Sequence, residues 1–145
     1  MTNLKSYITH SPEETEHLAA LIADKLHGNE TLAMFGGLGV GKTAFTRGLA
    51  KGLDIDDGVS SPTFAIVNEY EGRFPVHHFD MYRITSWDDL YSTGFFDYLE
   101  NGITVIEWSE NVETALPENA IIIRFEVLSE FERKITIHAE EEYLP

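Results

Sequence analysis

Apolar residues recur at helical spacing near the start of the chain and predict a first helix over residues 12–27. Ser11 is placed as its N-cap, Pro12 at its first position, and Glu14 as the acid that completes a capping box. Gly28 follows, where a left-handed C-terminal cap is expected. The buried stripe of this helix is expected to consist of Leu18, Leu21, Ile22 and Leu26.

A strand pattern and a second helical pattern follow, with a glycine cluster between them. Residues 31–35 form a short, mostly apolar run of strand length, and residues 43–53 have helical spacing with Gly52 near their end. The polar segment 54–62 has no periodicity and is expected to be a loop. The glycine cluster therefore connects a strand to the start of a helix.

Strand patterns dominate the middle of the chain. Residues 63–70 and 75–79 are expected to be strands joined by a turn at 71–73. Residues 103–106 form a more uniformly apolar strand that ends at Glu107, which is typical of a central parallel strand.

The remaining elements are two short helices and a hairpin. One helix is expected to begin at Ser86 and another to cover residues 109–115, and strands 121–127 and 132–138 are expected to pair. A chain of 145 residues with this mixture predicts a single domain over residues 1–145. Its expected fold class is α/β, with three layers and a mixed sheet whose parallel core is extended by antiparallel strands.

Charge changes along the chain, and the formal net charge is -15. Residues 1–53 hold five acids and five bases, residues 54–96 hold eight and two, and residues 97–145 hold twelve and three. Autonomous binding of nucleic acid is not expected, because it needs a basic face. A polyanionic ligand is expected in the neutral first third or through a metal ion. The acidic remainder is expected to be solvated or to dock a basic partner.

The absence of cysteine excludes disulfides, thiolate nucleophiles and sulfur-ligated metal sites. It is typical of a protein of the reducing cytosol, so a cytoplasmic location is expected. The longest apolar run, residues 18–23, is far shorter than the roughly 20 residues that cross a bilayer, and residues 1–10 lack an apolar signal core. Neither a membrane span nor secretion is expected.

The glycine cluster matches a phosphate-binding loop (P-loop, or Walker A motif) at residues 36–43: Gly, four residues, Gly, Lys and Thr. Glycines let such a loop surround a phosphate with backbone N–H groups, and the following helix directs its positive end there. The alternative is a glycine-rich turn that binds nothing, which the flanking strand and helix disfavour. Lys42 is expected to reach the outer phosphates and Thr43 to hold Mg²⁺. The residues assigned to nucleotide binding are Gly37, Leu38, Gly39, Val40, Gly41, Lys42, Thr43 and Ala44.

A nucleoside triphosphatase also needs acids at strand ends to hold the metal and orient water. Asp80 and Glu107 each end a predicted strand, and with Lys42 they form the candidate catalytic group. Asp80 is expected to ligate Mg²⁺ directly or through water. Glu107 is expected either to do the same or to position the attacking water. A helix cap or a surface charge is an equally good explanation of each acid taken alone.

The loop at residues 60–63 is a candidate switch segment. Ser61 and Thr63 carry hydroxyl groups of the kind that contact the metal and the γ-phosphate in triphosphatases. An ordinary turn, with Pro62 fixing the entry to the next strand, explains the segment equally well.

Two pairs of residues have competing structural explanations. His77 and His78 are adjacent, so on a strand they face opposite sides, and core or surface roles are favoured over a shared metal. Trp108 and Tyr82 are candidates for stacking on a nucleotide base, although most aromatic residues of a small domain belong to its core.

Adenine is the expected base by elimination, because no Asn-Lys-x-Asp segment that reads guanine follows the P-loop. The sequence also has no large insertion that would serve as a lid, which small-molecule kinases need to exclude water from the transferred phosphoryl group.

An ordered set of segments spans nearly the whole chain. Besides the P-loop, they are Ser61-Pro62-Thr63-Phe64, Val67-Asn68-Glu69-Tyr70, His78-Phe79-Asp80-Met81-Tyr82-Arg83, Gly94-Phe95 and Val105-Ile106-Glu107-Trp108. Together they resemble the TsaE family, also called YjeE. The resemblance implies a bacterial P-loop ATPase with slow intrinsic turnover that uses ATP and Mg²⁺. It also implies work with the TsaD and TsaB proteins in forming threonylcarbamoyladenosine in tRNA, the tRNA being held mostly by those partners.

The resemblance also assigns roles to individual residues. It implies that Lys42 and Thr43 bind the triphosphate and Mg²⁺, and that Ser61 and Thr63 form a switch-like segment. By the same resemblance Asp80 is the metal-associated acid, and Glu107 with Trp108 closes the site. The chain departs from the usual family pattern at Gly37, where an aspartate is common, and at Ala44, where a second threonine is common.

Three hypotheses remain at this point. The first is an ATPase whose nucleotide state sets its binding to a partner during tRNA modification. The second is a self-contained P-loop kinase for a small acceptor, and the third is a nucleotide-gated binding module that barely hydrolyses ATP. Slow turnover alone does not separate them, because an arginine supplied by a partner is worth about 10³ to 10⁵ in rate.

Overall fold

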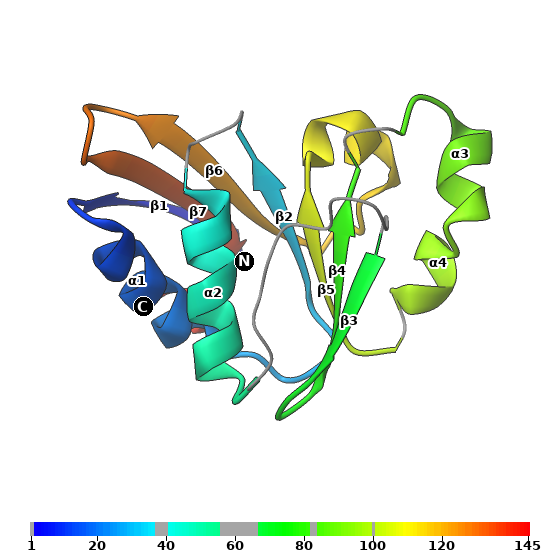
Figure 1. Cartoon of the computed structure of the whole chain (residues 1–145), viewed down its shortest axis with the longest axis horizontal. Helices are drawn as coiled ribbons and strands as arrows, with labels where there is room; N and C mark the ends of the chain where they lie inside the picture. The colour runs from blue at the N-terminus through cyan, green and yellow to red at the C-terminus, as the bar shows by residue number, and fades with distance from the viewer. Residues whose placement is uncertain (1, 37–40, 56–66, 82–83, 100) are drawn as a thin grey trace.

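The computed structural model describes residues 2–36, 41–55, 67–81, 84–99 and 101–145. In these ranges the protein forms a seven-stranded sheet with the order β1-β7-β6-β2-β5-β4-β3 (Figure 1). Strands β6, β2, β5 and β4 are parallel to one another, and β7, β1 and β3 are antiparallel to their neighbours. The strands are β1 (Thr2–Thr9), β2 (Thr31–Phe35), β3 (Val67–Glu71), β4 (Pro75–Asp80), β5 (Ile103–Glu107), β6 (Ile121–Val127) and β7 (Arg133–Glu140).

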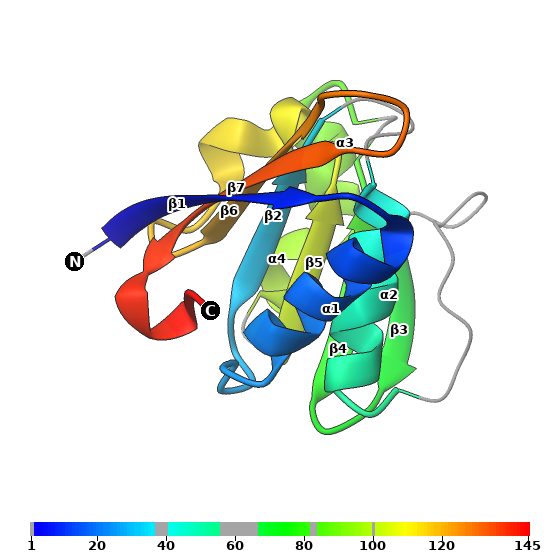
Figure 2. The same ribbon diagram turned by 90° about the vertical axis from the view of Figure 1, so that its left-hand side faces the viewer.

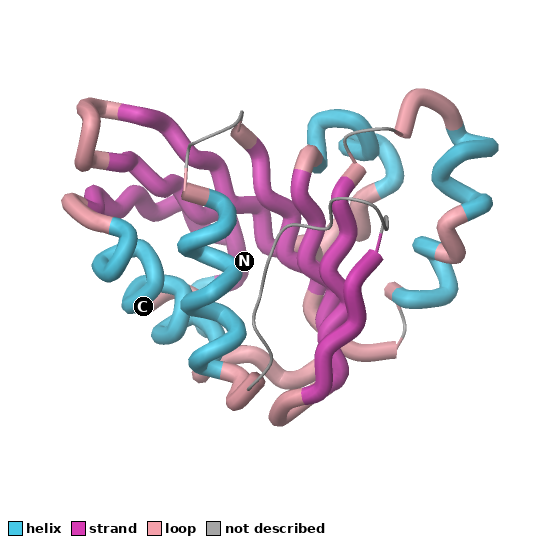
Figure 3. Tube along the Cα trace, in the orientation of Figure 1, coloured by secondary structure: helices cyan, strands magenta, loops and turns pink. Residues whose placement is uncertain are grey.

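Helices cover both faces of the sheet. α1 (Pro12–Ala23) and α2 (Lys42–Gly52) lie on one side, and α3 (Trp87–Ser92), α4 (Phe95–Tyr98) and the 3₁₀ helix η1 (Ser109–Ala115) lie on the other (Figures 1 and 2). A short 3₁₀ helix, η2 (Glu141–Tyr143), follows β7. In Figure 3 the magenta sheet separates the cyan helices into these two groups. The predicted three-layer α/β fold with a mixed sheet is therefore confirmed.

Each face of the sheet has its own apolar core. On the first face, Phe45 of α2 packs with residues such as Ile123 of β6. On the second, Phe79 of β4 packs with Phe95 of α4, with ring centroids 5.4 Å apart. Strands β2 and β5 lie between the two cores, and for that reason all five residues of each are buried.

Most predicted elements are present where they were expected. β2 and η1 occupy the predicted residues, α2 begins and ends one residue early, and β6 pairs with β7 as the predicted hairpin. The hydroxyl of Ser86 accepts a hydrogen bond from the backbone of Asp89, which starts α3 as predicted. Residues 56–66, which belong to the predicted loop and to the start of the predicted strand 63–70, lie outside the described residues. No helix in the described ranges is long and apolar enough to cross a membrane.

The first helix ends earlier than its periodicity predicts. α1 stops at Ala23, and the chain turns because the carboxylate of Glu30 accepts hydrogen bonds from the backbone N–H groups of residues 27–29. Gly28 adopts a left-handed φ of 117° within this turn. A Cβ at that position would meet the ring of Phe74 at 2.7 Å, so Gly28 is needed for a close approach rather than for capping the helix.

One of the two hydrogen bonds of the predicted capping box is present at the start of α1. The hydroxyl of Ser11 accepts a hydrogen bond from the backbone of Glu14, but the Glu14 carboxylate accepts one from His10 instead of from Ser11. Three of the four residues in the predicted apolar stripe are buried, whereas Leu21 is 39% exposed. Leu21 lies within α1 but outside its buried face, which consists of Thr15, Leu18, Ala19, Ile22 and Ala23.

Strand β1 and helix α4 are not predicted by the sequence pattern. β1 is an edge strand in which Leu4 and Ile8 are exposed, so it lacks the alternation of a half-buried strand. It is held by antiparallel pairing with β7, which joins Thr9 to Arg133 across most of the chain length. Pairing between such distant segments leaves no local signal in the sequence.

Helices α1 and α2 approach each other closely at Gly48. A Cβ placed on Gly48 would lie 2.1 Å from the backbone oxygen of Glu16, so no larger residue fits unless the helices separate. This contact sets the position of α2, the helix that follows the glycine cluster, against the sheet.

We expect Gly48→Ala to lower the free energy of unfolding by about 3 kcal/mol, because the added methyl group forces α1 and α2 apart. Urea unfolding followed by circular dichroism measures this. Arg47→Ala, at an exposed neighbouring position of the same helix, is the control and should change stability by about 0.5 kcal/mol at most. Equal stability of the Gly48→Ala variant and the wild type would contradict the close approach.

Candidate functional site

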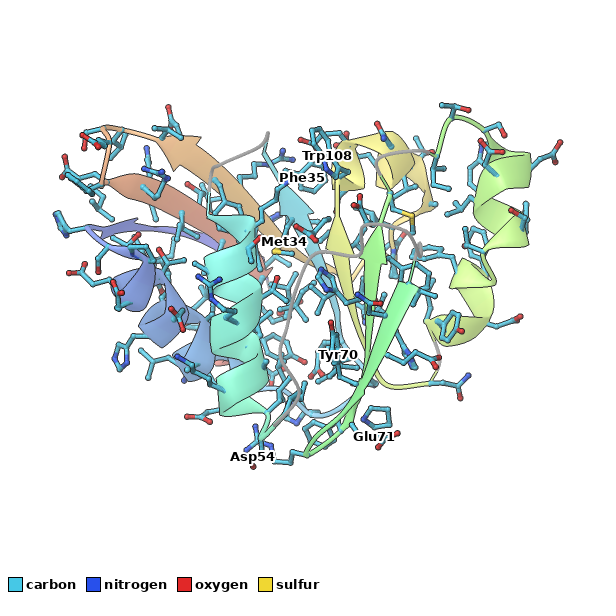
Figure 4. The ribbon with its side chains drawn as sticks, viewed as in Figure 1. Met34, Phe35, Asp54, Tyr70, Glu71 and Trp108 are labelled. Carbon is cyan, nitrogen blue, oxygen red and sulfur yellow. The ribbon has the colours of Figure 1, made fainter. Side chains whose placement is uncertain are left out.

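The carboxyl ends of β2, β5 and β4 meet the start of α2 at one edge of the sheet (Figure 1). In Figure 4, Phe35 and Trp108 lie at this edge, and Asp54 and Glu71 lie at the opposite end of the molecule. Open α/β sheets bind their ligands at the carboxyl ends of their strands. The candidate site residues described by the structure gather here.

Lys42 is the first residue of α2, and only 5% of its surface is exposed. Its ammonium donates a hydrogen bond of 2.7 Å to the backbone oxygen of Gly36 and lies 4.3 Å from the ring centroid of Trp108. Gly41, with a left-handed φ of 106°, is the N-cap and has no side chain to occupy the first N–H groups of the helix. The positive end of α2 and the Lys42 ammonium thus favour an anion at the same place.

Trp108 has a backbone conformation that is rare for a residue with a side chain. Its φ of 59° and ψ of 43° are left-handed, at a cost of roughly 1–2 kcal/mol. This turn directly follows β5 and brings the indole ring against the ammonium of Lys42. Strain of this kind persists only where surrounding contacts impose it, and it is concentrated at functional sites.

Three carboxylates lie close enough to Lys42 to affect its titration. Burial lowers the pKa of Lys42, and the negative charges of Glu107, Glu110 and Asp80 offset part of that lowering. The bound phosphates of a nucleotide would add further negative charge beside this ammonium and so favour its charged form. The site therefore combines one buried cation with three acids at the ends of β4 and β5 and in η1.

Glu107 is held by a buried histidine. His78 Nε2 lies 2.8 Å from Glu107 Oε2, and the side chains are 2% and 6% exposed. An ionised carboxylate only accepts hydrogen bonds, so Nε2 is the donor when Glu107 is charged. His78 Nδ1 is buried and has no hydrogen-bond partner among the described residues. The contact therefore fixes one oxygen of Glu107 and leaves its second oxygen outside this bond.

Sequence reasoning did not connect His78 with Glu107. His78 and Asp80 are two apart on β4, so they share the face of the sheet that carries α2, and Asp80 is paired in register with Glu107. His77 points to the other face, where its Nε2 is 2.6 Å from the backbone oxygen of Asn101. The two histidines therefore have different partners, in agreement with the prediction that they face opposite sides.

Glu110 and Asn111 of η1 are two further residues that the sequence analysis did not select. The Glu110 carboxylate accepts a hydrogen bond of 2.9 Å from the backbone of Gly36, and the Asn111 amide donates one of 2.8 Å to the backbone oxygen of Met81. η1 thus ties the loop after β2 to the chain just after Asp80. The local sequence offers one signal for Glu110. It lies three residues after Glu107, the candidate acid that ends β5.

The structure places several predicted site residues and leaves others undescribed. It brings Lys42, Asp80, Glu107 and Trp108 to one edge of the sheet. Thr43 is half-buried and Ala44 buried in the first turn of α2. The predicted residues Gly37, Leu38, Gly39, Val40, Ser61 and Thr63 lie outside the described residues.

The oxygen donors of the site fit a hard divalent cation that is also bound by phosphates. Within the described ranges, no three His, Cys, Asp or Glu side chains group as a complete metal site. Mg²⁺ rarely needs such a group, because it usually binds one or two carboxylates together with substrate phosphates and water. The hydroxyl of Thr43 and the carboxylates of Asp80 and Glu107 are the oxygen atoms that this arrangement offers.

Comparison with known proteins identifies the family. Residues 9–135 match the family model described as threonylcarbamoyl adenosine biosynthesis protein TsaE. Two curated relatives carry the name tRNA threonylcarbamoyladenosine biosynthesis protein TsaE. The protein from Aquifex aeolicus is 38% identical over 141 residues, covering 95% of this chain and 98% of its own. The protein from Treponema pallidum is 34% identical over 131 residues, covering 90% and 97%.

A solved structure agrees with the sequence comparison. The crystal structure of Bacillus subtilis YdiB superposes with a TM-score of 0.75 at 33% sequence identity, covering 96% of this chain and 87% of that one. The family match spans the described residues of the candidate site and five complete strands of the sheet, β2 to β6. The chain therefore belongs to the TsaE family.

Proposed function

We propose that this protein binds and slowly hydrolyses ATP with Mg²⁺, as an accessory protein in the formation of N6-threonylcarbamoyladenosine in tRNA. In this proposal it acts in the cytoplasm as a nucleotide-dependent switch on an assembly of TsaB and TsaD. The observation that carries the ATPase part is the buried ammonium of Lys42, which faces Glu107 and Asp80 at the start of α2. The names of the relatives support the pathway.

Lys42 and the first turn of α2 are proposed to bind the outer phosphates. The Lys42 ammonium donates a hydrogen bond to the backbone oxygen of Gly36. To bind a phosphate, it would either keep this bond and donate a second one to a phosphate oxygen, or give up the bond to Gly36. Thr43 and Asp80 are the residues that would hold Mg²⁺, which when bound would neutralise charge on the phosphate oxygens. Trp108 excludes water from one side of Lys42 and strengthens the electrostatic attraction between the ammonium and a phosphate.

Glu107 is proposed to orient the attacking water, with His78 as its positioning residue. His78 holds Oε2 of Glu107, so the carboxylate keeps one orientation, and Oε1 is available to accept a hydrogen bond from water. Asp80 is half-buried rather than buried, which suits an acid that shares a hydrated metal. If Glu107 orients water and Asp80 holds the metal, substitutions of the two acids should have different effects on Mg²⁺ dependence.

The net charge of -15 supports an accessory role in tRNA modification. Strong negative charge opposes direct contact with a tRNA backbone, so the tRNA is expected to be bound by the partner assembly. The partners would then sense the nucleotide state of this protein through a surface near its site.

The first experiment measures Mg²⁺-dependent ATP hydrolysis by the purified protein, alone and with TsaB and TsaD, and scores modified adenosine in tRNA in the same reactions. We expect the partners to stimulate hydrolysis, and repeated tRNA modification only with this protein and ATP. Lys42→Ala should abolish both effects, and Lys51→Ala, an exposed lysine of the same helix, is its control. Absence of stimulation and of any effect on tRNA would contradict the proposal. ATP consumption stimulated by a small acceptor would instead support a kinase.

Asp80→Asn and Glu107→Gln test the roles of the two acids. We expect each to lower partner-stimulated hydrolysis by about 100-fold or more, because each removes a carboxylate charge from the reaction centre. Asp80→Asn should also raise the Mg²⁺ concentration needed for half-maximal hydrolysis, because it removes a proposed Mg²⁺ ligand, whereas Glu107→Gln should leave nucleotide affinity nearly unchanged. Glu71→Gln, at the opposite end of the sheet, is the control. Full activity of both variants would show that the assignments are wrong.

His78→Gln tests the positioning of Glu107. We expect kcat to fall about 10- to 100-fold with little change in ATP affinity, since the carboxylate loses its fixed orientation but the phosphate contacts remain. His77→Gln, the neighbour on the opposite face, should leave kcat unchanged. Thermal unfolding of both variants separates a loss of stability from a loss of positioning. An equal effect of the two substitutions on kcat would rule out a specific role for His78.

A further inference from the structure

An exposed cluster of aromatic side chains lies on α3 and α4. Trp87 and Tyr91 are 51% and 63% exposed, and both contact the half-buried ring of Phe96. The Trp87 and Phe96 rings are stacked with centroids 6.2 Å apart, and Tyr91 lies 5.0 Å from Phe96. Contiguous exposed apolar patches mark interaction sites, whereas apolar residues exposed singly do not.

A cleft opens beside this cluster, between α3 and η1. Its volume is about 150 Å³, and Trp87 forms one wall. The buried side chains of Leu90 and Val112 line it, and Thr85 and Thr114 contribute polar groups. A volume of about 150 Å³ equals that of a cavity that binds benzene, so the cleft is large enough for a single side chain.

The described residues of α3, α4 and η1 include acids but no Lys, Arg or His, and Arg83, which precedes Ile84 of the cleft in the sequence, lies outside the described residues. Residues 84–123 contain eight acids and no Lys, Arg or His. Asp88 of α3, Asp97 of α4, and Glu110 and Glu113 of η1 are exposed and come from the elements that form the cluster and the cleft. Such a surface repels nucleic acids and acidic proteins and attracts a basic segment.

We propose that the cleft between α3 and η1, with the aromatic cluster of Trp87, Tyr91 and Phe96, is the docking site for a basic segment of a partner protein. An apolar side chain of that segment occupies the cleft, and flanking Lys or Arg side chains face the surrounding acids. Trp87 and Tyr91 supply the anchoring apolar area, and the acids select the partner by charge.

Docking at this surface is coupled to the candidate nucleotide site through η1. η1 has a non-helical backbone at Val112. Before this kink it holds Gly36 through Glu110 and Met81 through Asn111, and Val112 and Thr114 line the cleft. A segment in the cleft therefore changes the contacts of a helix that touches the ends of β2 and β4. Only this coupling rests on the proposed function, and the docking proposal stands whether or not the protein binds a nucleotide.

Amide-resolved NMR locates the docking site with defined probes. The probe is a five-residue peptide with leucine between two pairs of arginines, titrated into the labelled wild-type protein. We expect saturable shifts in Trp87–Ser92 and Ser109–Ala115 and at the indole N–H of Trp87. Peptides with glycine for leucine, or glutamate for arginine, test the apolar and the charged part. Shifts elsewhere, no shifts, or equal shifts with the glycine peptide would overturn the proposal.

Matched variants test the two parts of the surface. Trp87→Ala should weaken binding of the leucine peptide about tenfold or more. Phe131→Ala, which removes an aromatic side chain that is 67% exposed in the β6–β7 hairpin, should not. Asp88→Asn combined with Glu113→Gln should also weaken it, whereas Glu13→Gln combined with Glu141→Gln should not. Equal affinity of all variants would overturn the docking site.

Two additional measurements separate other outcomes. Shifts at the same residues on raising the protein concentration without peptide would show that a second copy covers the surface, which overturns the proposal. Repeating the titration with a non-hydrolysable ATP analogue tests coupling, and a changed peptide affinity is expected. Peptide docking without any nucleotide binding would contradict the proposed function and leave the docking site standing. Docking and nucleotide binding without mutual effect would overturn only the coupling.

Discussion

Parallel pairing of β5 with β2 on one side and β4 on the other is the constraint on which the site depends. Because parallel strands end at the same edge of a sheet, this pairing brings Asp80, Glu107 and the start of the glycine loop together. The crossovers that parallel pairing requires also place α2 on one face and α3 and α4 on the other. The close approach of α1 and α2 at Gly48 then fixes where Lys42 lies.

The electrostatics of the site follow from placing one buried ammonium among acids in a strongly acidic chain. Burial lowers the pKa of Lys42, and the three nearby carboxylates counteract that effect. In the proposed function these acids would also repel a bound triphosphate, and a divalent cation would reduce that repulsion. Lys42 belongs to the neutral first third of a chain with a net charge of -15, whereas the three acids beside it belong to the acidic remainder.

The short helix η1 joins the interior of the site to the outer surface of the molecule. Its first residues hold the chain after β2 and after β4, and its later residues line the cleft beside α3. A 3₁₀ helix of this length has few internal hydrogen bonds, so its position depends on these contacts. In the proposed docking, these contacts would connect a partner in the cleft to the candidate nucleotide site.

The sequence by itself determined the fold class, most elements and the identity of the site's main groups. Glycine spacing predicts the loop before Lys42, and the uniform apolar run before Glu107 predicts a central strand, because both signals are local. Tertiary structure alone decided that His78 holds Glu107, that Glu110 holds Gly36 and that β1 closes the sheet against β7. These contacts join residues distant in the chain, and their partners are chosen by strand register and helix packing. Neighbouring residues carry no pattern that reveals them.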